Sequence, residues 1–130
     1  LLTLGVKSGM VIYGQDCLDE LSMSAPTSVC EFRDGWYRRY TLKPEDFGFT
    51  RCTKDDIRGG DPAENAAVTL AILKGAQGPK TDIVLLNAGA AIYVGGKAKN
   101  IAEGIEVARQ MIASGAALKK LEEFKQLSNA

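Results

Sequence analysis

The chain has 130 residues and contains no histidine. Histidine is the commonest general base and the commonest transition-metal ligand, so chemistry here must come from carboxylates, hydroxyls, Lys, Arg or a hard metal ion. No apolar run approaches the ~20 residues that a membrane-spanning helix requires. The first residues, LLTLGVKSG, lack the basic and long apolar regions of a signal peptide.

The sequence has no excess of either charge, because 16 basic residues balance 16 acidic residues. Binding to nucleic acid or to an anionic membrane needs a basic face, so we expect neither partner. The three cysteines, Cys17, Cys30 and Cys52, match no zinc-binding spacing. We expect free thiols in a reducing compartment, which indicates a cytoplasmic protein.

With 45% hydrophobic and 25% charged residues, the composition is that of one ordinary globular domain over residues 1–130. The chain begins with Leu rather than Met. The opening LLTLG is typical of the last turn of a helix followed by a glycine stop signal. We therefore expect a fragment of a larger protein.

Strands are predicted in the first third of the chain. The run Gly9–Tyr13 (GMVIY) is apolar throughout, which is typical of a strand buried on both faces of a parallel sheet. The segments Ser28–Phe32 and Trp36–Leu42 flank an Asp34-Gly35 pair, a strong signal for a hairpin. So few strands cannot complete an α/β sheet, and we expect strands from a missing portion to pair beside the first one.

Four or five helices are predicted after the hairpin. Asp61-Pro62-Ala63-Glu64 is a well-formed start signal, and Asn100 with Glu103 forms a second. The run Ile83–Val94 is apolar almost all round, which indicates a helix buried on most sides. The expected helices run from residue 62 to about 74, from about 79 to 94, from 101 to about 114, and from 116 to 126.

The chemistry-bearing stretch is Tyr13–Thr27 (YGQDCLDELSMSAPT), which follows the first strand and carries Asp16, Asp19 and Glu20. Ligands of α/β proteins gather at the carboxyl ends of strands. Mg²⁺ is typically held by one or two carboxylates, water and substrate phosphates. Asp19 and Glu20 could form such a site or cap a short helix, and the spacing alone favours the cap.

Other polar residues have a structural interpretation that the sequence favours over a functional one. Gly59-Gly60 precedes a helix start and could cradle an anion, but capping by Asp61 explains the pattern. The hydroxyls of Ser22, Ser24 and Thr27 could contact a substrate or hold a turn. Cys17 has no histidine to activate it, and we expect Asn87 to bond locally within its buried helix.

The stretch YGQDCLDELSMSAPT resembles the segment HG-x-DGLDE-[LI]S-x-x-GPT of the anthranilate phosphoribosyltransferases. The similarity continues through PEDFGF, DDIRGGDPAENA, VLLNAGAAIYVGG and GIEVARQMIASGAALKKLEE. It covers nearly the whole chain, and the combination of motifs is specific. The resemblance implies the α/β fold of the nucleoside phosphorylase and phosphoribosyltransferase catalytic domain, with residues 1–130 as a C-terminal part of the glycosyl transferase family 3 α/β domain.

The resemblance also implies an activity, the transfer of phosphoribose from phosphoribosyl pyrophosphate (PRPP) to anthranilate in tryptophan biosynthesis. By position, Asp19 and Glu20 correspond to the pair that binds Mg²⁺ in this family. No catalytic or further cofactor-binding residue is assigned in this chain. The intact enzyme is expected to be a homodimer, whereas the fragment lacks the glycine-rich PRPP loop and should be inactive alone.

Two departures from the family pattern occur in the acidic loop: Tyr13 replaces the family's histidine, and Cys17 replaces a glycine. A non-glycine residue reduces backbone freedom at position 17. Two alternative functions stay open: a short non-catalytic module that binds a partner or a magnesium phosphate, and a fragment related to pyrimidine nucleoside phosphorylases.

Overall fold

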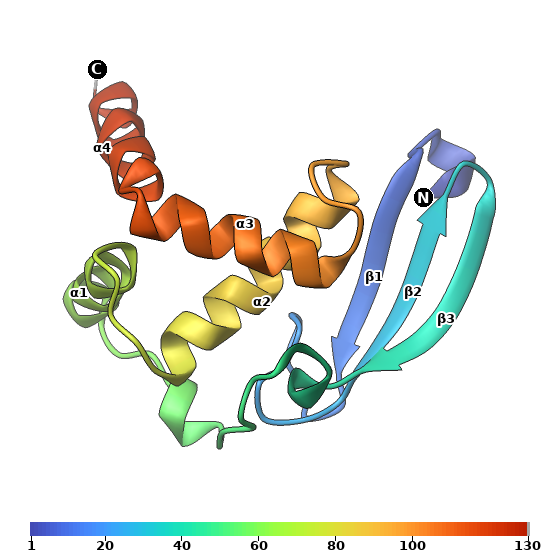
Figure 1. Cartoon of the computed structure of the whole chain (residues 1–130), viewed down its shortest axis with the longest axis horizontal. Helices are drawn as coiled ribbons and strands as arrows, with labels where there is room; N and C mark the ends of the chain where they lie inside the picture. Colours follow the sequence, from blue (N-terminus) through green and yellow to red (C-terminus); the bar gives the residue numbers. More distant parts are fainter. Residues whose placement is uncertain (130) are drawn as a thin grey trace.

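The computed structural model describes residues 1–129, in which a three-stranded sheet lies beside four α-helices (Figure 1). The helices α2 and α3 lie between the sheet and the outer helices α1 and α4. In chain order the elements are η1 (Leu2–Leu4), β1 (Ser8–Gly14), β2 (Thr27–Arg33), β3 (Trp36–Leu42), η2 (Pro44–Phe47), η3 (Asp55–Ile57), α1 (Pro62–Leu73), α2 (Pro79–Val94), α3 (Ile101–Ala113) and α4 (Ala116–Ser128).

The predicted hairpin is confirmed as β2 and β3. The two strands pair antiparallel over their whole length, from Thr27 opposite Leu42 to Arg33 opposite Trp36. Asp34 and Gly35 both adopt positive φ, at 48° and 89°. Two left-handed residues give the turn whose twist matches that of the flanking strands, which is why Asp-Gly was an effective signal.

The expectation for the first strand is wrong in two respects. β1 is not paired in a parallel arrangement but runs antiparallel to β2, with Ile12 opposite Val29. It is also not buried on both faces, because Val11 and Tyr13 are 54% and 53% exposed. Successive strand side chains point to opposite faces, and the helices cover only the face that carries Met10 and Ile12.

Local capping signals start two of the helices where the sequence predicts them. The Asp61 side chain accepts from the backbone N–H of Glu64 at 2.8 Å, and the Glu64 carboxylate accepts from the N–H of Asp61 at 2.9 Å. Asn100 caps α3 by accepting from the N–H of Glu103 at 2.8 Å. These bonds satisfy amide groups that have no partner within the helix.

Two glycines allow α2 and α3 to cross closely. A Cβ atom on Gly89 would lie 2.7 Å from the backbone nitrogen of Ile105, and one on Gly104 would overlap the carbonyl oxygen of Gly89. Around this crossing, apolar residues of the helices pack with Leu21, Met23 and Val29 in the main core. The small residues of α2 therefore admit a neighbouring backbone at this point.

A buried carboxylate joins the sheet to the helices. Glu31 of β2 is 2% exposed. It accepts hydrogen bonds from the hydroxyl of Tyr93 in α2 at 2.6 Å and from the hydroxyl of Tyr40 in β3 at 2.7 Å. The guanidinium of Arg38 adds a charged bond at 2.8 Å. The buried charge is tolerated because both oxygens of the Glu31 carboxylate accept hydrogen bonds.

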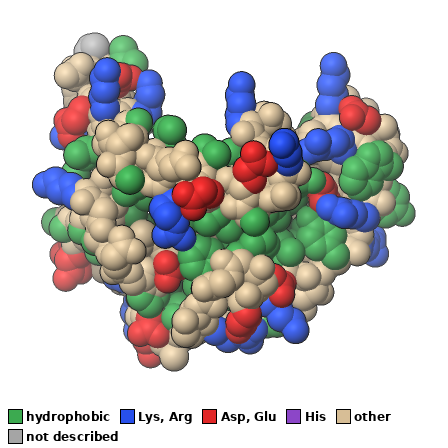
Figure 2. Space-filling model, viewed as in Figure 1, with side chains coloured by type: hydrophobic (Ala, Val, Ile, Leu, Met, Phe, Trp, Pro, Cys, Tyr) green, Lys and Arg blue, Asp and Glu red, His purple; other side chains and the backbone are tan. Residues whose placement is uncertain are grey.

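Apolar side chains gather in the middle of the molecular face shown in Figure 2, and several Lys and Arg side chains project from its upper edge. The outermost helix, α4, has no buried residue, and Phe124 is 65% exposed. No helix in the described part of the chain is both long and apolar enough to cross a membrane.

Candidate functional site at the acidic loop

The loop between β1 and β2, residues 15–26, is closed by backbone hydrogen bonds. The N–H of Gly14 donates to the carbonyl of Leu18 at 2.9 Å, and the N–H of Gln15 donates to the carbonyl of Pro26 at 2.9 Å. Between them, Cys17 adopts a left-handed conformation with φ of 71°. The departure from the family's glycine therefore falls on a backbone position that favours glycine.

Asp16 is the centre of this loop. Its Oδ2 atom accepts from the hydroxyl of Ser22 at 2.8 Å and from the hydroxyl of Ser24. The Ser22 hydroxyl oxygen in turn accepts from the N–H groups of Ser24 and Ala25, at 3.0 and 3.1 Å. The serine hydroxyls are thus occupied inside the turn, which confirms their structural interpretation.

The surroundings of Asp16 favour its ionised form. Burial opposes ionisation, but the hydrogen bonds from Ser24 and Ser22 outweigh it and hold the pKa of this carboxyl below its ordinary value. The second oxygen, Oδ1, is buried and has no hydrogen-bond partner among the described residues. The Oδ2 atom of Asp16 therefore holds the loop, while its Oδ1 atom is free to accept a hydrogen bond.

Asn87 of α2 fixes the acidic stretch at Leu21, directly after the Asp19-Glu20 pair. Its Oδ1 accepts from the N–H of Leu21 at 2.9 Å, and its Nδ2 donates to the carbonyl of Leu21 at 2.9 Å. A local bond to the carbonyl of Ile83 at 3.0 Å also forms, as predicted. The bonds to Leu21 span 66 positions of sequence and were not predicted. The only available signal was one amide in an otherwise apolar helix.

Asp19 and Glu20 lie between these two anchors. Both are exposed, neither lies in a helix, and neither carboxylate accepts a hydrogen bond from residues 1–129. The helix-capping alternative is therefore wrong. Partial desolvation of Glu20, and then the neighbouring charge of Asp19, raise the pKa of Glu20 above its ordinary value. Two adjacent anions without partners are stabilised by a bound cation.

Glu20 lines a hollow of about 300 Å³ between the loop, η3 and α2. Leu18, Ile57 and Ile83 supply apolar walls, and Lys54 and Arg58 supply two positive charges. Lys54 donates through Nζ to the backbone carbonyl of Asp16. Arg58 pairs with Asp55 at 3.0 Å in an exposed position. The hollow thus combines a carboxylate with two cations.

The donor set suits Mg²⁺ better than a transition metal. Among residues 1–129, no group of three or more Asp, Glu, Cys or His side chains is arranged to hold a metal ion. A closed zinc site needs four such ligands, whereas Mg²⁺ keeps several waters and takes one or two carboxylates together with phosphates. Asp19 and Glu20, as a pair of carboxylates, match the ligands that Mg²⁺ takes.

The segment Arg58–Asn65 acts as a helix start. The Asn65 side chain accepts from the N–H of Gly60 and donates to its carbonyl, both at 2.9 Å. The Asp61 carboxylate occupies the first turn of α1. Both groups are used in capping, which confirms the structural interpretation of this motif.

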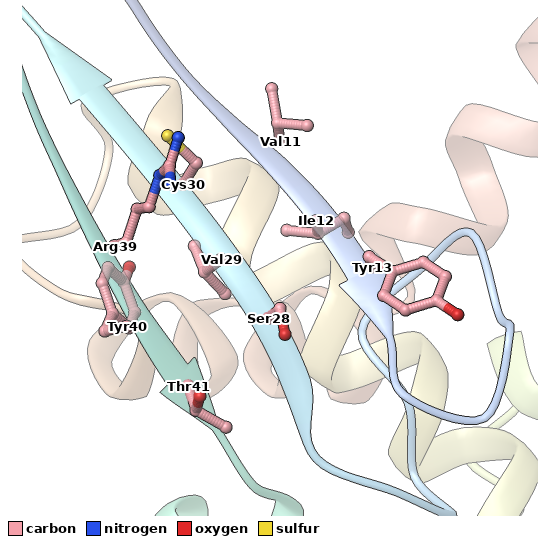
Figure 3. Close-up of a pocket in the computed structure, with 9 residues that line it drawn as sticks. All are labelled: Val11, Ile12, Tyr13, Ser28, Val29, Cys30, Arg39, Tyr40 and Thr41. Carbon is pink, nitrogen blue, oxygen red and sulfur yellow. The ribbon is translucent and has the colours of Figure 1, made fainter.

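A second and larger hollow, of about 580 Å³, lies on the sheet and extends to Tyr13, where the acidic stretch begins. Figure 3 shows its lining, in which Val11, Cys30 and Arg39 come from adjacent strands. It contains no carboxylate and therefore lacks the chemistry of the acidic loop. Cys30 and the other two cysteines are free, as predicted.

The fold and the acidic loop define a class of protein. The chain belongs to the glycosyl transferase family, through its a/b domain, whose family model matches residues 1–118. Its relatives within that class are anthranilate phosphoribosyltransferases. The fold predicted from the resemblance is therefore confirmed. Three antiparallel strands, two of which form the hairpin, are followed by four α-helices.

Two relatives illustrate the match in sequence. The anthranilate phosphoribosyltransferase of Methanobrevibacter smithii is 52% identical over 130 residues, which are 100% of this chain and 39% of that protein. The enzyme of Clostridium beijerinckii is 49% identical over 127 residues, 98% of this chain and 38% of that protein. The chain thus spans well under half the length of these relatives.

Solved structures agree with this assignment. The anthranilate phosphoribosyltransferase of Thermus thermophilus superposes with a TM-score of 0.88 at 38% identity, covering 99% of this chain and 38% of that one. The Saccharomyces cerevisiae enzyme in complex with PRPP and Mg gives 0.84 at 27% identity, covering 95% and 36%. A third structure, with 4-fluoroanthranilate, gives 0.87 at 26% identity, covering 99% and 38%.

Proposed function

We propose that residues 1–130 are the C-terminal part of the α/β domain of an anthranilate phosphoribosyltransferase. The whole enzyme would be a cytoplasmic homodimer that transfers phosphoribose from PRPP to the amine of anthranilate and releases pyrophosphate. Similarity along the entire chain to enzymes of this activity supports the proposal. The relative solved with PRPP and Mg supports the choice of substrate and metal.

Asp19 and Glu20 are the proposed Mg²⁺ ligands. The observation that carries this role is their pair of carboxylates, which lack partners among the described residues and lie between the anchors at Asp16 and Asn87. When bound, Mg²⁺ neutralises the charge that develops on the departing pyrophosphate. This chain contributes the fixed position of the two ligands. We assign it no general base.

A chimeric enzyme tests the proposal. The 130 residues replace the matching segment of the M. smithii relative, to which they are 52% identical. We expect the chimera to consume anthranilate, followed by its fluorescence, only when PRPP and Mg²⁺ are present. Replacing Asp19→Asn and Glu20→Gln together should lower kcat/KM by about 100-fold or more, because the metal's ligands are lost.

The matched control replaces Glu122→Gln and Glu123→Gln on α4, which removes the same charge from an adjacent acidic pair outside the loop. This control should leave kcat/KM unchanged. Full activity of the Asp19 and Glu20 double variant at limiting Mg²⁺ would overturn the metal assignment. An inactive chimera that folds and binds PRPP would overturn the proposed activity.

A further inference from the structure

We infer that Lys54 and Arg58 form a cationic wall that binds the phosphate oxygens of a magnesium–diphosphate complex held beside Asp19 and Glu20. The inference rests on the proposed function, since it adds the anion-binding side chains to the proposed metal site. Lys54 was not singled out in the sequence, and Arg58 entered only as the first residue of the segment Arg58–Asn65, which was interpreted as a helix start. Both residues lie in a mixed-charge segment, KDDIR, that is typical of an exposed turn.

The two cations lie at the ends of one short element. Lys54 is the N-cap and Arg58 the C-cap of η3, so one turn of helix separates them. The element packs against α2, and Ile57 contributes to the wall of the hollow. Lys54 and Arg58 therefore border the same hollow of about 300 Å³ as Glu20. Carboxylate and cations together match a ligand with a metal ion and an anionic group.

Both side chains keep donors free for such a ligand. Lys54 uses one N–H on the carbonyl of Asp16, and an ammonium group has three. Arg58 pairs only with Asp55 in the described chain, and the two side chains are 77% and 81% exposed. An exposed pair of this kind is weak, so the guanidinium can turn to a phosphate, which it binds in a bidentate manner.

The local charge balance determines the form of the ligand. Glu20 lines the hollow, Asp19 precedes it in the chain, and Asp55 pairs with Arg58, so three carboxylates accompany the two cations. A free diphosphate would meet net repulsion there. A magnesium complex satisfies both halves of the site, because its metal faces the carboxylates and its phosphate oxygens face Lys54 and Arg58. The expected ligand is therefore magnesium diphosphate.

Calorimetry on the 130-residue chain tests the inference, with Mg²⁺ alone, inorganic diphosphate alone, and both together as probes. We expect the combination to bind and diphosphate alone to bind much more weakly. The Lys54→Gln, Arg58→Gln double variant should weaken binding of magnesium diphosphate by about tenfold or more. Its affinity for Mg²⁺ alone should stay that of the unmodified chain.

A variant with Arg58→Gln alone tests whether binding is lost because the acidic loop is disturbed. Arg58 makes no bond to that loop, whereas Lys54 does. The variant should weaken magnesium diphosphate binding while the far-ultraviolet circular dichroism stays unchanged. A Lys119→Gln, Lys120→Gln variant on α4 removes the same charge and should bind normally.

Unchanged binding of magnesium diphosphate in the Lys54 and Arg58 double variant would overturn the inference, as would no binding by the unmodified chain. The Asp19→Asn, Glu20→Gln variant separates the two proposals. If it binds Mg²⁺ normally while the Lys54 and Arg58 variant loses diphosphate, the metal assignment fails and the cationic wall stands.

Discussion

At the scale of single residues, the acidic loop contains a backbone conformation that does not suit its side chain. Cys17 has φ of 71°, where a Cβ atom is unfavourable. The two residues that follow Leu18 are the proposed metal ligands. The loop keeps this conformation because Asp16 and Asn87 hold it through side-chain hydrogen bonds on either side of the Asp19-Glu20 pair. The strain at Cys17 is thus offset by bonds elsewhere in the loop.

Replacing Cys17→Gly should raise the free energy of unfolding by about 0.5–1 kcal/mol, since relief of the left-handed conformation exceeds the added entropy of the unfolded chain. Urea denaturation of the chain measures this change. The control Cys17→Ala keeps a Cβ atom and should give no gain. Equal stabilisation by alanine would show that the thiol, rather than the backbone, is the unfavourable group.

At the scale of elements, the helical layer depends on the close crossing of α2 and α3. Gly89 and Gly104 bring the two backbones together at a point where no side chain fits. The same contact positions α2, and α2 carries both Asn87 and the wall residue Ile83. Helix packing therefore reaches the candidate site through two side chains of α2, the Asn87 amide that holds Leu21 and the apolar side chain of Ile83.

The variant Gly104→Ala should lower the free energy of unfolding by about 1–3 kcal/mol, because its Cβ atom would overlap the carbonyl oxygen of Gly89 and force the helices apart. Thermal and urea denaturation measure the loss. Arg109→Ala on the exposed side of α3 is the control, with an expected change within about 0.5 kcal/mol. A Gly104→Ala variant as stable as the unmodified chain would contradict a tight crossing.

At the scale of the whole molecule, Glu31 links the sheet layer to the helical layer. Burial opposes its ionisation, but the hydrogen bonds from Tyr93, Tyr40 and Arg38 outweigh burial and hold the pKa of this carboxyl below its ordinary value. A group whose pKa is lowered by folding stabilises the folded state above its unfolded pKa. That contribution is lost as the pH falls through the lowered folded value.

Glu31→Gln should therefore lower the free energy of unfolding near pH 7 by about 1.5–3 kcal/mol, the range for hydrogen bonds to a charged group. The difference from the unmodified chain should shrink as the pH falls below about 4.3, the usual pKa of Glu, because the unfolded chain is protonated there first, and it should be lost once the folded Glu31 is protonated as well. Urea denaturation between pH 7 and pH 3 measures both effects. Glu45→Gln, in an exposed pair with Arg51, should give a much smaller change. A difference independent of pH would contradict this role.

Much of the fold could be predicted from the sequence. Asp61 and Asn100 marked helix starts, and Asp34-Gly35 marked the hairpin, because each signal acts within a few residues of chain. The first strand was mispredicted, since an apolar run does not reveal which of its faces another layer covers. Val11 and Tyr13 are exposed because the helices pack on the opposite face.

For the candidate site, the acidic stretch, its Asp19-Glu20 pair and the family resemblance could be recognised from the sequence. The surroundings of that pair depend on the tertiary structure. The bond between Leu21 and Asn87 spans 66 positions, and the bond between Asp16 and Lys54 spans 38. Contacts of this length depend on how the helices pack against the loop. They leave no periodic or local pattern in the sequence, because their partners become neighbours only when the core forms.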